Sequence, residues 1–259
     1  MSTVRLKNGI RLNYVEQGPG EGTPVLFLHG ITDSSFSFSP VLPLLGPSVR
    51  AIAPDQRGHG DSDKPPTGYT TDHLAADALA LLDALEIPAA IVVGHSMGSF
   101  VAQQMAVRAP ERVAGLVLVG SGSPHTDAVY GLLAATAELS DPVPEEFCRQ
   151  FQMSTICRPV PPEFLEAVVS ESRKVPLRVW TGCLDGMLRH APPLERICCP
   201  SVLLWGDCDA VFCREEQEEL RCRIPGARLR IASGVGHAYH WEAPDQFVHE
   251  LQSVLPVSA

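Results

Sequence analysis

Short apolar segments alternate with helical patterns along this chain, and this alternation limits the possible folds more than any other feature. Six such segments stand out, at residues 25–28, 49–53, 90–93, 113–119, 202–205 and 229–231. Most have no polar side, which is typical of parallel strands that helices cover on both faces. Between them, residues 72–85 carry leucines at helical spacing, with Thr71 or Asp72 as the predicted N-cap. These patterns predict an α/β fold with a mostly parallel sheet.

Residues 4–14 and 123–193 depart from this pattern. The first range alternates polar and apolar side chains around Asn8-Gly9, which predicts an antiparallel hairpin and brings the expected sheet to eight strands. The second is rich in proline, cysteine and helix formers and contains no evident strand. We predict a helical cap over residues 123–193, inserted between strands 6 and 7 of a core formed by residues 1–122 and 194–259. The alternative for this segment is a packing layer that never contacts a ligand.

The composition argues against several classes of protein. The chain has 259 residues, of which 45% are hydrophobic and 19% charged, as in ordinary folded proteins. A net charge of -10 without a Lys/Arg run argues against nucleic-acid and anionic-membrane partners. With no evident export signal and no apolar stretch near membrane-spanning length, we expect a cytoplasmic protein. Eight cysteines fall between Cys148 and Cys222, and we expect free, mostly buried thiols.

Residues 94–98 read Gly-His-Ser-Met-Gly and directly follow the apolar segment at 90–93. A helical pattern then runs from Ser99 to Arg108, so Ser96 stands at a sharp turn between a strand and a helix. This is the context of a nucleophile elbow, in which two glycines allow close backbone contacts and the serine hydroxyl is presented at the sheet edge. Because glycine and serine are common, the inference depends on partners elsewhere in the chain.

A serine hydroxyl becomes a good nucleophile when a base removes its proton and an acidic side chain orients that base. Two carboxylates, Asp207 and Asp209, follow the segment at 202–205. We predict Asp209 as the orienting acid, because it lies further from the strand and nearer the turn that would aim it at an imidazole. Asp207 is then interpreted as a turn residue that bonds its own backbone.

The predicted base is His237, which lies in a glycine-rich loop after the segment at 229–231. Its rival is His240, and the two together could suggest a metal site. Such a site needs a third ligand, and Glu242 is the only nearby carboxylate. We therefore predict no metal. No Gly-x-Gly-x-x-Gly or P-loop spacing occurs in the sequence, and we predict no organic cofactor.

Attack by a serine on a carbonyl produces an oxyanion, which two backbone N–H groups should stabilise. One donor follows the nucleophile, at Met97. The other should come from the loop after residues 25–28, which reads His29-Gly30-Ile31-Thr32, and we predict the amide of Ile31. The alternative for His29-Gly30 is a simple turn.

The chain resembles the α/β-hydrolase superfamily, in its capped branch that is similar to esterases and epoxide hydrolases. The matching segments keep the family's order over nearly the whole chain: residues 28–30, 55–62, 94–98, 206–209, 236–237 and 241–244. The resemblance implies the α/β-hydrolase fold and gives residues 55–62 a structural role near the site. It also implies the roles of the site residues: Ser96 as nucleophile, His237 as base, Asp209 as acid, and the amides of Ile31 and Met97 as oxyanion hole.

The serine at the elbow narrows the activity that this resemblance implies. Members of the family that open epoxides or remove halides carry aspartate there, and relatives that cleave carbon–carbon bonds often carry asparagine where this chain has His95. We therefore expect a serine hydrolase of the carboxylesterase or lactonase type, acting on a neutral, partly hydrophobic small molecule. The alternatives are a carbon–carbon bond hydrolase, a cofactor-free perhydrolase, and a ligand receptor that retains the triad.

Overall fold

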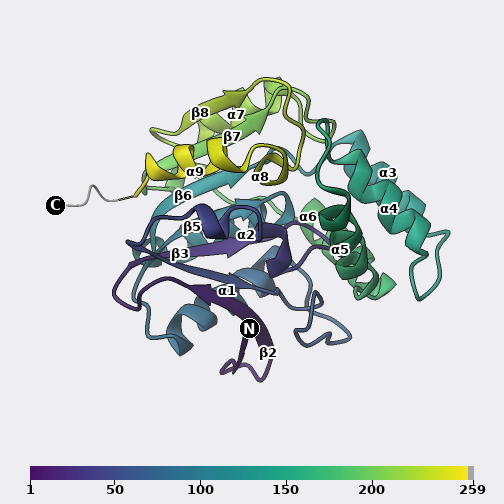
Figure 1. Cartoon of the computed structure of the whole chain (residues 1–259), viewed down its shortest axis with the longest axis horizontal. Helices are drawn as coiled ribbons and strands as arrows, with labels where there is room; N and C mark the ends of the chain where they lie inside the picture. Colours follow the sequence, from purple (N-terminus) through teal and green to yellow (C-terminus); the bar gives the residue numbers. More distant parts are fainter. Residues whose placement is uncertain (256–259) are drawn as a thin grey trace.

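One mixed sheet organises residues 1–255, the part of the chain that the computed structural model describes, and helices cover both of its faces (Figure 1). Its strand order is β1-β2-β4-β3-β5-β6-β7-β8. The hairpin β1–β2 pairs antiparallel, β2 joins β4 antiparallel, and the other pairings are parallel. The strands are β1 (Ser2–Arg5), β2 (Arg11–Gln17), β3 (Thr23–Leu28), β4 (Val49–Pro54), β5 (Ala90–His95), β6 (Val113–Val119), β7 (Ser201–Gly206) and β8 (Arg228–Ala232). The predicted eight-stranded, mostly parallel sheet is confirmed.

The two helices predicted with bounds, at residues 72–85 and 99–108, are confirmed as α1 and α2 with small differences at their ends. The α-helices are α1 (Thr71–Ala84), α2 (Met97–Arg108), α3 (Asp127–Thr136), α4 (Glu145–Ser154), α5 (Pro162–Arg173), α6 (Leu177–Leu188), α7 (Arg214–Arg223), α8 (Tyr239–Glu242) and α9 (Pro244–Gln252). Short 3-10 helices complete the set: η1 (Ser35–Phe38), η2 (Leu42–Leu44), η3 (Pro110–Arg112) and η4 (Leu194–Arg196). The predicted N-cap of α1 was wrong, because Thr70 accepts the hydrogen bond from the amide of His73. Thr70, Thr71 and Asp72 all have side chains that can cap a helix, and the local sequence does not determine which of them does so.

The sheet is buried on both faces along its central strands. Alternate residues of β5 belong to two apolar clusters, with Val92 on one face and Ile91 and Val93 on the other. This is the two-sided burial expected of a parallel strand between helix layers. The last strand, β8, differs because it lies at the sheet edge, where Arg230 and Ile231 are exposed.

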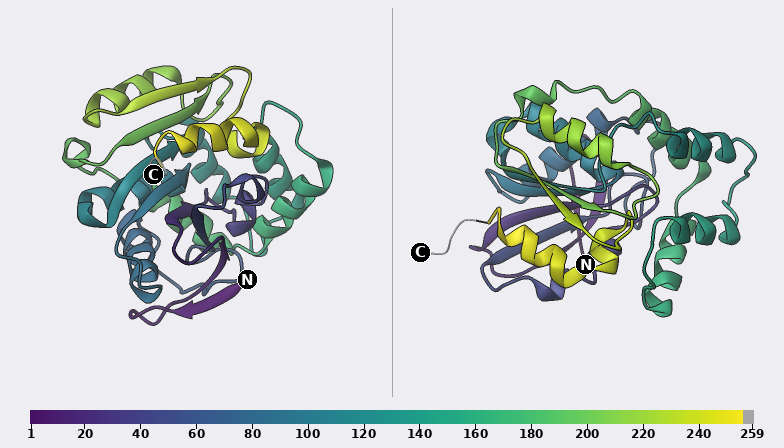
Figure 2. Two further views of the ribbon diagram at one scale, coloured as in Figure 1. Left: turned by 60° about the vertical axis from the view of Figure 1, so that its left-hand side comes forward. Right: turned by 90° about the horizontal axis from the view of Figure 1, so that it is seen from above.

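Helices α3–α6 lie between β6 and β7 in the chain, and this stretch contains no strand of the sheet, as predicted. We call residues 123–193 the α3–α6 segment. Figures 1 and 2 show α3, α4 and α5 beside one end of the sheet, away from the C-terminus. Within residues 1–255, the longest apolar helix falls short of what a membrane crossing needs.

All eight cysteines are free thiols, but the prediction that most are buried was wrong. Only Cys148 and Cys183 are buried. Several of the others lie on polar helices and turns: Cys213 is the N-cap of α7, Cys222 lies within that helix, and Cys208 lies in the turn after β7. The general tendency of cysteine to be buried does not tell which face of an element a given residue occupies.

Candidate active site

Ser96 lies between β5 and α2 with backbone angles φ 51° and ψ -119°. Such a conformation costs a non-glycine residue about 1–3 kcal/mol, so surrounding contacts must maintain it. The amide of Ser96 donates to the carbonyl of Val119 on β6, at 2.9 Å. The carbonyl of Ser96 accepts two hydrogen bonds from Ser99, from the amide at 2.8 Å and from Oγ at 2.6 Å. The strained turn is thereby fixed on both sides.

Two glycines make this turn sterically possible. A Cβ atom at Gly94 would collide with the backbone of Gly98, and one at Gly98 would collide with the carbonyl of Leu28 on β3. Both collisions are with backbone atoms, which have no rotamer to change. The two glycines of the predicted elbow are therefore required by close packing of β3, β5 and α2.

The turn after β7 and the loop after β8 bring Asp209 and His237 together. Asp209 Oδ2 lies 3.0 Å from His237 Nδ1, and both side chains are buried. The other carboxylate oxygen, Oδ1, accepts the amides of Val211 at 2.7 Å and Phe212 at 3.1 Å. Because a carboxylate can only accept, the hydrogen of the neutral imidazole is on Nδ1, and Nε2 keeps a lone pair.

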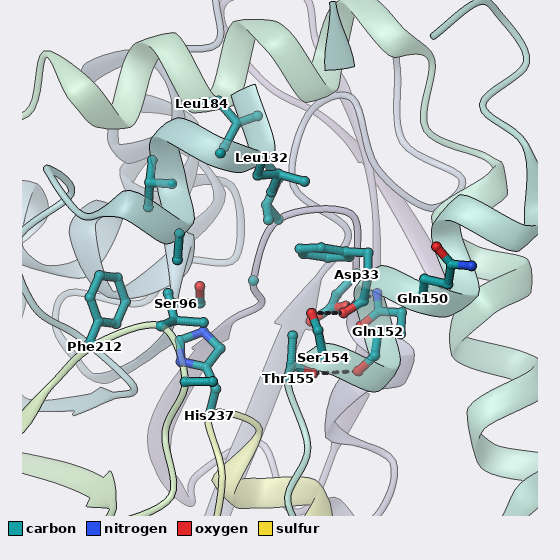
Figure 3. A pocket seen from close by; sticks show the side chains of 18 of the residues that line it. Asp33, Ser96, Leu132, Gln150, Gln152, Ser154, Thr155, Leu184, Phe212 and His237 are labelled. Atoms are coloured by element: carbon teal, nitrogen blue, oxygen red, sulfur yellow. Dashed lines mark hydrogen bonds between the residues drawn. The ribbon is translucent and has the colours of Figure 1, made fainter. Parts of the chain in front are cut away.

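Ser96 and His237 lie next to each other at the wall of one cavity, as Figure 3 shows. A Cβ at Gly120, the residue after β6, would lie 2.8 Å from His237 Nδ1. Since the preceding Val119 bonds the amide of Ser96, the same strand end contacts both residues. No direct hydrogen bond between the two side chains is present in the described chain. Hydrogen bonds of this kind are often long without substrate and tighten when it binds.

The two rivals of these residues lie elsewhere. Asp207 is exposed and accepts the amide of Gly234 at 2.5 Å, a bond that lowers the pKa of its carboxyl. It thus ties the turn after β7 to the loop after β8, rather than bonding its own turn. His240 is buried, with Nε2 2.9 Å from Ser37 Oγ, and burial lowers its pKa to about 3. Among residues 1–255, no group of three or more His, Cys, Asp or Glu residues could hold a metal ion.

The amides predicted for the oxyanion hole belong to Ile31 and Met97. Met97 is the first residue of α2, so its N–H has no acceptor within the helix. Ile31 lies in the turn after β3 and lines the same cavity as Ser96. In the turn formed by Gly30 to Asp33, the amide of Asp33 donates to the carbonyl of Gly30 at 3.4 Å.

The neighbouring loop at residues 55–62 contributes buried structural contacts. Burial alone would raise the pKa of Asp55, but the amides of Asp61 and Ser35 bond its carboxylate and hold the pKa below the ordinary value. His29 accepts the amide of Gln56 at Nε2, at 2.9 Å, and burial lowers its pKa to about 4. These contacts join the end of β3 to the end of β4.

The cavity has a volume of about 440 Å³, and its wall is mostly apolar. Its apolar side chains come chiefly from the α3–α6 segment and the loop after β7: Val129, Leu132, Phe147, Phe151, Leu184, Met187, Val211 and Phe212. The wall also contains His95, which the sequence analysis used only to compare this chain with its relatives, and Asp33 and Gln152, which the sequence patterns did not single out. Only the position of Asp33, four residues after His29 in a strand-end loop, could have drawn attention to it. No lysine or arginine is among the residues that line the cavity, all of which lie in the described range.

Comparison with known proteins identifies the family. The model of the alpha/beta hydrolase family matches residues 25–250. The chain belongs to this family. In this alpha/beta hydrolase, the elbow, the carboxylate–imidazole pair and the turn after β3 thus meet at one edge of the family's sheet, and the resemblance inferred from the sequence is confirmed.

Relatives of this alpha/beta hydrolase include named enzymes. A non-heme chloroperoxidase from Streptomyces lividans is 42% identical over 126 residues, which is 48% of this chain and 46% of that protein. The chain thus spans less than half the length of this relative. A hydrolase from Pseudomonas aeruginosa is 27% identical with a TM-score of 0.87, covering 99% of this chain and 98% of that one. The esterase RhEst1 from a Rhodococcus species is also 27% identical, with a TM-score of 0.83 and 97% of both chains covered. These likenesses support a hydrolase activity.

Proposed function

We propose that this protein is a serine hydrolase that cleaves a carboxylic ester or a lactone through an acyl-enzyme. In this proposal Ser96 is the nucleophile, His237 the base and Asp209 the acid that orients the base. The amides of Ile31 and Met97 form the oxyanion hole. The α3–α6 segment acts as a cap that shapes the substrate pocket, over a core of residues 1–122 and 194–259.

The observation that carries this proposal is the hydrogen bond between Asp209 and His237 beside Ser96, at the wall of an apolar cavity. The bond keeps the hydrogen of the imidazole on Nδ1 and leaves Nε2 as the basic nitrogen. Asp209 has its remaining oxygen bonded by two backbone amides, so its carboxylate is held in one orientation. The pair is therefore pre-organised before any substrate enters.

The reaction follows from these positions. Ser96 Oγ attacks the carbonyl carbon while His237 Nε2 accepts the hydroxyl proton, and the negative oxygen of the tetrahedral intermediate is bonded by the two amides. Collapse of the intermediate breaks the carbon–oxygen bond, and His237 gives its proton to the leaving alcohol. A water molecule that His237 deprotonates then attacks the acyl-enzyme and releases the acid. With a lactone, acid and alcohol leave as one hydroxy acid.

The cavity wall favours a neutral and partly hydrophobic substrate. A carboxylate or phosphate on the substrate would find no lysine or arginine among the lining residues. It would also meet the carboxyl group of Asp33. Burying such an unpaired charge is costly, whereas an acyl chain would gain contact with Leu132, Phe151 and Leu184.

Active-site labelling followed by turnover tests this function. We expect a fluorophosphonate probe to add one phosphonyl group to the wild-type protein, measured by intact mass, and none to Ser96→Ala. The wild type should then turn over p-nitrophenyl esters from acetate to decanoate, or lactones of five- to seven-membered rings. Labelling without multiple turnover would favour a ligand receptor, and labelling of Ser96→Ala would reveal a different nucleophile.

The relative named chloroperoxidase supports a second candidate, perhydrolysis at the same serine. In that reaction hydrogen peroxide attacks the acyl-enzyme in place of water, and the products are a peroxy acid and the free serine. Bromination of a phenol that depends on hydrogen peroxide, bromide and acetate would measure it, because the peroxy acid oxidises bromide to the brominating hypobromous acid. If Ser96→Ala abolishes ester cleavage but leaves bromination unchanged, the second activity does not belong to this site.

A further inference from the structure

The carboxyl group of Asp33 lines the cavity, yet the proposed reaction does not use it. Asp33 is buried, and its amide closes the turn with Gly30 whose central residues are Ile31 and Thr32. Thr32 has a φ of 67°, a left-handed conformation that is unfavourable for a β-branched residue. The turn that carries the Ile31 amide is therefore strained and must be held by other contacts.

Those contacts come from the α3–α6 segment. The side-chain nitrogen Nε2 of Gln152, on α4, lies 3.1 Å from Asp33 Oδ1 and 3.2 Å from Thr32 Oγ1. The same nitrogen lies 2.8 Å from Ser172 Oγ on α5, and Ser172 Oγ is 3.3 Å from Thr32 Oγ1. All four side chains are buried. Asp33 and Thr32 thus connect the turn to two helices of the α3–α6 segment; Gln152, Ser154 and Thr155 appear beside Asp33 in Figure 3.

The second oxygen of Asp33 faces His95, the residue before the proposed nucleophile. His95 Nε2 lies 3.2 Å from the carbonyl oxygen of His237, which can only accept, so Nε2 carries the imidazole hydrogen. Burial holds the pKa of His95 well below its usual value, and the ring is neutral. Its Nδ1 therefore presents a lone pair, without a hydrogen-bond partner in the described chain, 3.8 Å from Asp33 Oδ2.

We infer that Asp33 is a positioning residue that works as a neutral carboxylic acid, joining the Ile31 turn to His95 and, through His95, to the His237 loop. This role rests on the proposed function of Ser96 and His237. With an ionised carboxylate, two hydrogen-bond acceptors would face each other. A protonated Asp33 can instead donate from Oδ2 to His95 Nδ1 when the separation of these atoms, 3.8 Å in the structure, shortens to hydrogen-bond distance. Its other oxygen still accepts the bond from Gln152.

The surroundings of Asp33 favour the neutral form. Burial raises the pKa of Asp33 to about 7, against the opposing effect of hydrogen bonds from Gln152 and Ser37. The titratable groups that face it are His95 on β5 and His237 after β8, with His240 behind Ser37. Of these, His95 and His240 are neutral because burial lowers their pKa.

Ionisation of Asp33 would disturb catalysis more than binding. The new negative charge would lie beside the turn that should stabilise the oxyanion, and it would repel the lone pair of His95. Substrate binding uses the apolar wall and is little affected. We therefore expect kcat to fall as the pH rises through about 7, with KM almost constant.

The variant Asp33→Asn tests this inference because it imitates the neutral acid. The amide oxygen can accept from Gln152 and the amide nitrogen can donate to His95. We expect kcat within about threefold of the wild type near pH 6, and no decline of kcat above pH 7. Asp33→Ala, which can do neither, should lower kcat by about 10- to 100-fold at every pH with little change in KM. The control Asp185→Asn removes an exposed carboxyl on α6 and should keep the wild-type profile.

Three results would overturn the inference. If kcat still declines above pH 7 in Asp33→Asn, a group other than Asp33 titrates. A loss in Asp33→Asn as large as that in Asp33→Ala means that the ionised form is required. Full activity of folded Asp33→Ala means that Asp33 positions nothing.

A measurement without substrate separates this inference from the proposed function. A carboxyl group whose pKa is raised in the folded state contributes stability that is fully present below its unfolded pKa and is lost as the pH rises from that value to the folded pKa. The difference in thermal midpoint between Asp33→Asn and the wild type should therefore grow in favour of the variant from about pH 4 to about pH 7 and stay constant above that. A constant difference contradicts a buried neutral acid, even if Ser96 is labelled. The expected gain, found without Ser96 labelling or turnover, leaves the neutral acid in place and refutes the hydrolase proposal.

Discussion

The sheet edge and the α3–α6 segment build different parts of the same cavity wall, and they differ in chemistry. Each ionisable residue among the lining residues comes from the sheet edge: Asp33 and His237 lie in loops, and His95 is the last residue of β5. The α3–α6 segment contributes apolar side chains and uncharged amides and hydroxyls. One region therefore holds the groups that can move protons, and the other sets the shape and polarity of the space in which they act.

The two regions also differ in how firmly they are fixed. At the sheet edge, Gly94, Gly98 and Gly206 have no room for a Cβ, because backbone atoms of α2, of the end of β3 and of the loop after β8 occupy the space. In α3, by contrast, only Val129 and Thr136 are buried. Close packing of this kind fixes the backbone of the sheet edge in one arrangement. Most side chains of α3 are not buried, so they can be substituted with little loss of stability. Substitutions should consequently act on kcat at the sheet edge and on substrate preference in the α3–α6 segment.

The largest expected effect distinguishes the two histidines of the loop after β8. His237→Ala should lower kcat by roughly 10⁵- to 10⁶-fold, as expected when a group of a catalytic triad is removed as a unit. His240→Ala removes a buried ring that is bonded to Ser37, so it should reduce stability but leave most of the activity. Ester turnover and circular dichroism of both variants make the comparison. If His237→Ala is folded and retains activity, the catalytic base is not His237 and does not come from this loop at the sheet edge.

A smaller effect is expected from the two carboxylates after β7. Asp209→Asn should lower kcat by up to about 10⁴-fold, because an amide nitrogen facing His237 Nδ1 would favour the wrong tautomer. Asp207→Asn changes only an exposed bond to Gly234 and should have much less effect. Steady-state kinetics of the pair, at equal folded fraction, give the measurement. The reverse order would show that the acid was assigned to the wrong residue.

The sequence predicted the parts of the site that local patterns encode. A strand, a glycine-flanked serine and a helix define the elbow within a short stretch, and chain order places Asp209 and His237 after it. The role inferred for Asp33 depends instead on Gln152, 119 residues further along the chain, and on the tautomer of His95. No spacing rule relates such residues, because their contacts arise only when α4 packs against the turn after β3.

The errors have the same origin. The strands were located well because continuous apolar runs report burial on two faces. The exposed thiols and the N-cap at Thr70 were missed. The burial of a thiol depends on the face of the helix or turn on which it lies, and capping depends on which residue's side chain reaches the free amide. Residue type alone predicts such features only on average.

The smallest effect, and the sharpest test of the contrast between the two regions, comes from enlarging a side chain on α3. Leu132 lines the cavity beside Leu184, so Leu132→Trp should fill part of the acyl space and lower kcat/KM for decanoate about tenfold. The kcat for acetate should stay unchanged, since Ser96 and His237 keep their positions. Ala134→Trp places the same indole on the exposed side of α3 and should change neither value. If Leu132→Trp lowers kcat equally for both esters, the α3–α6 segment takes part in the chemical step. The proposed difference between a catalytic sheet edge and a substrate-selecting α3–α6 segment is then wrong.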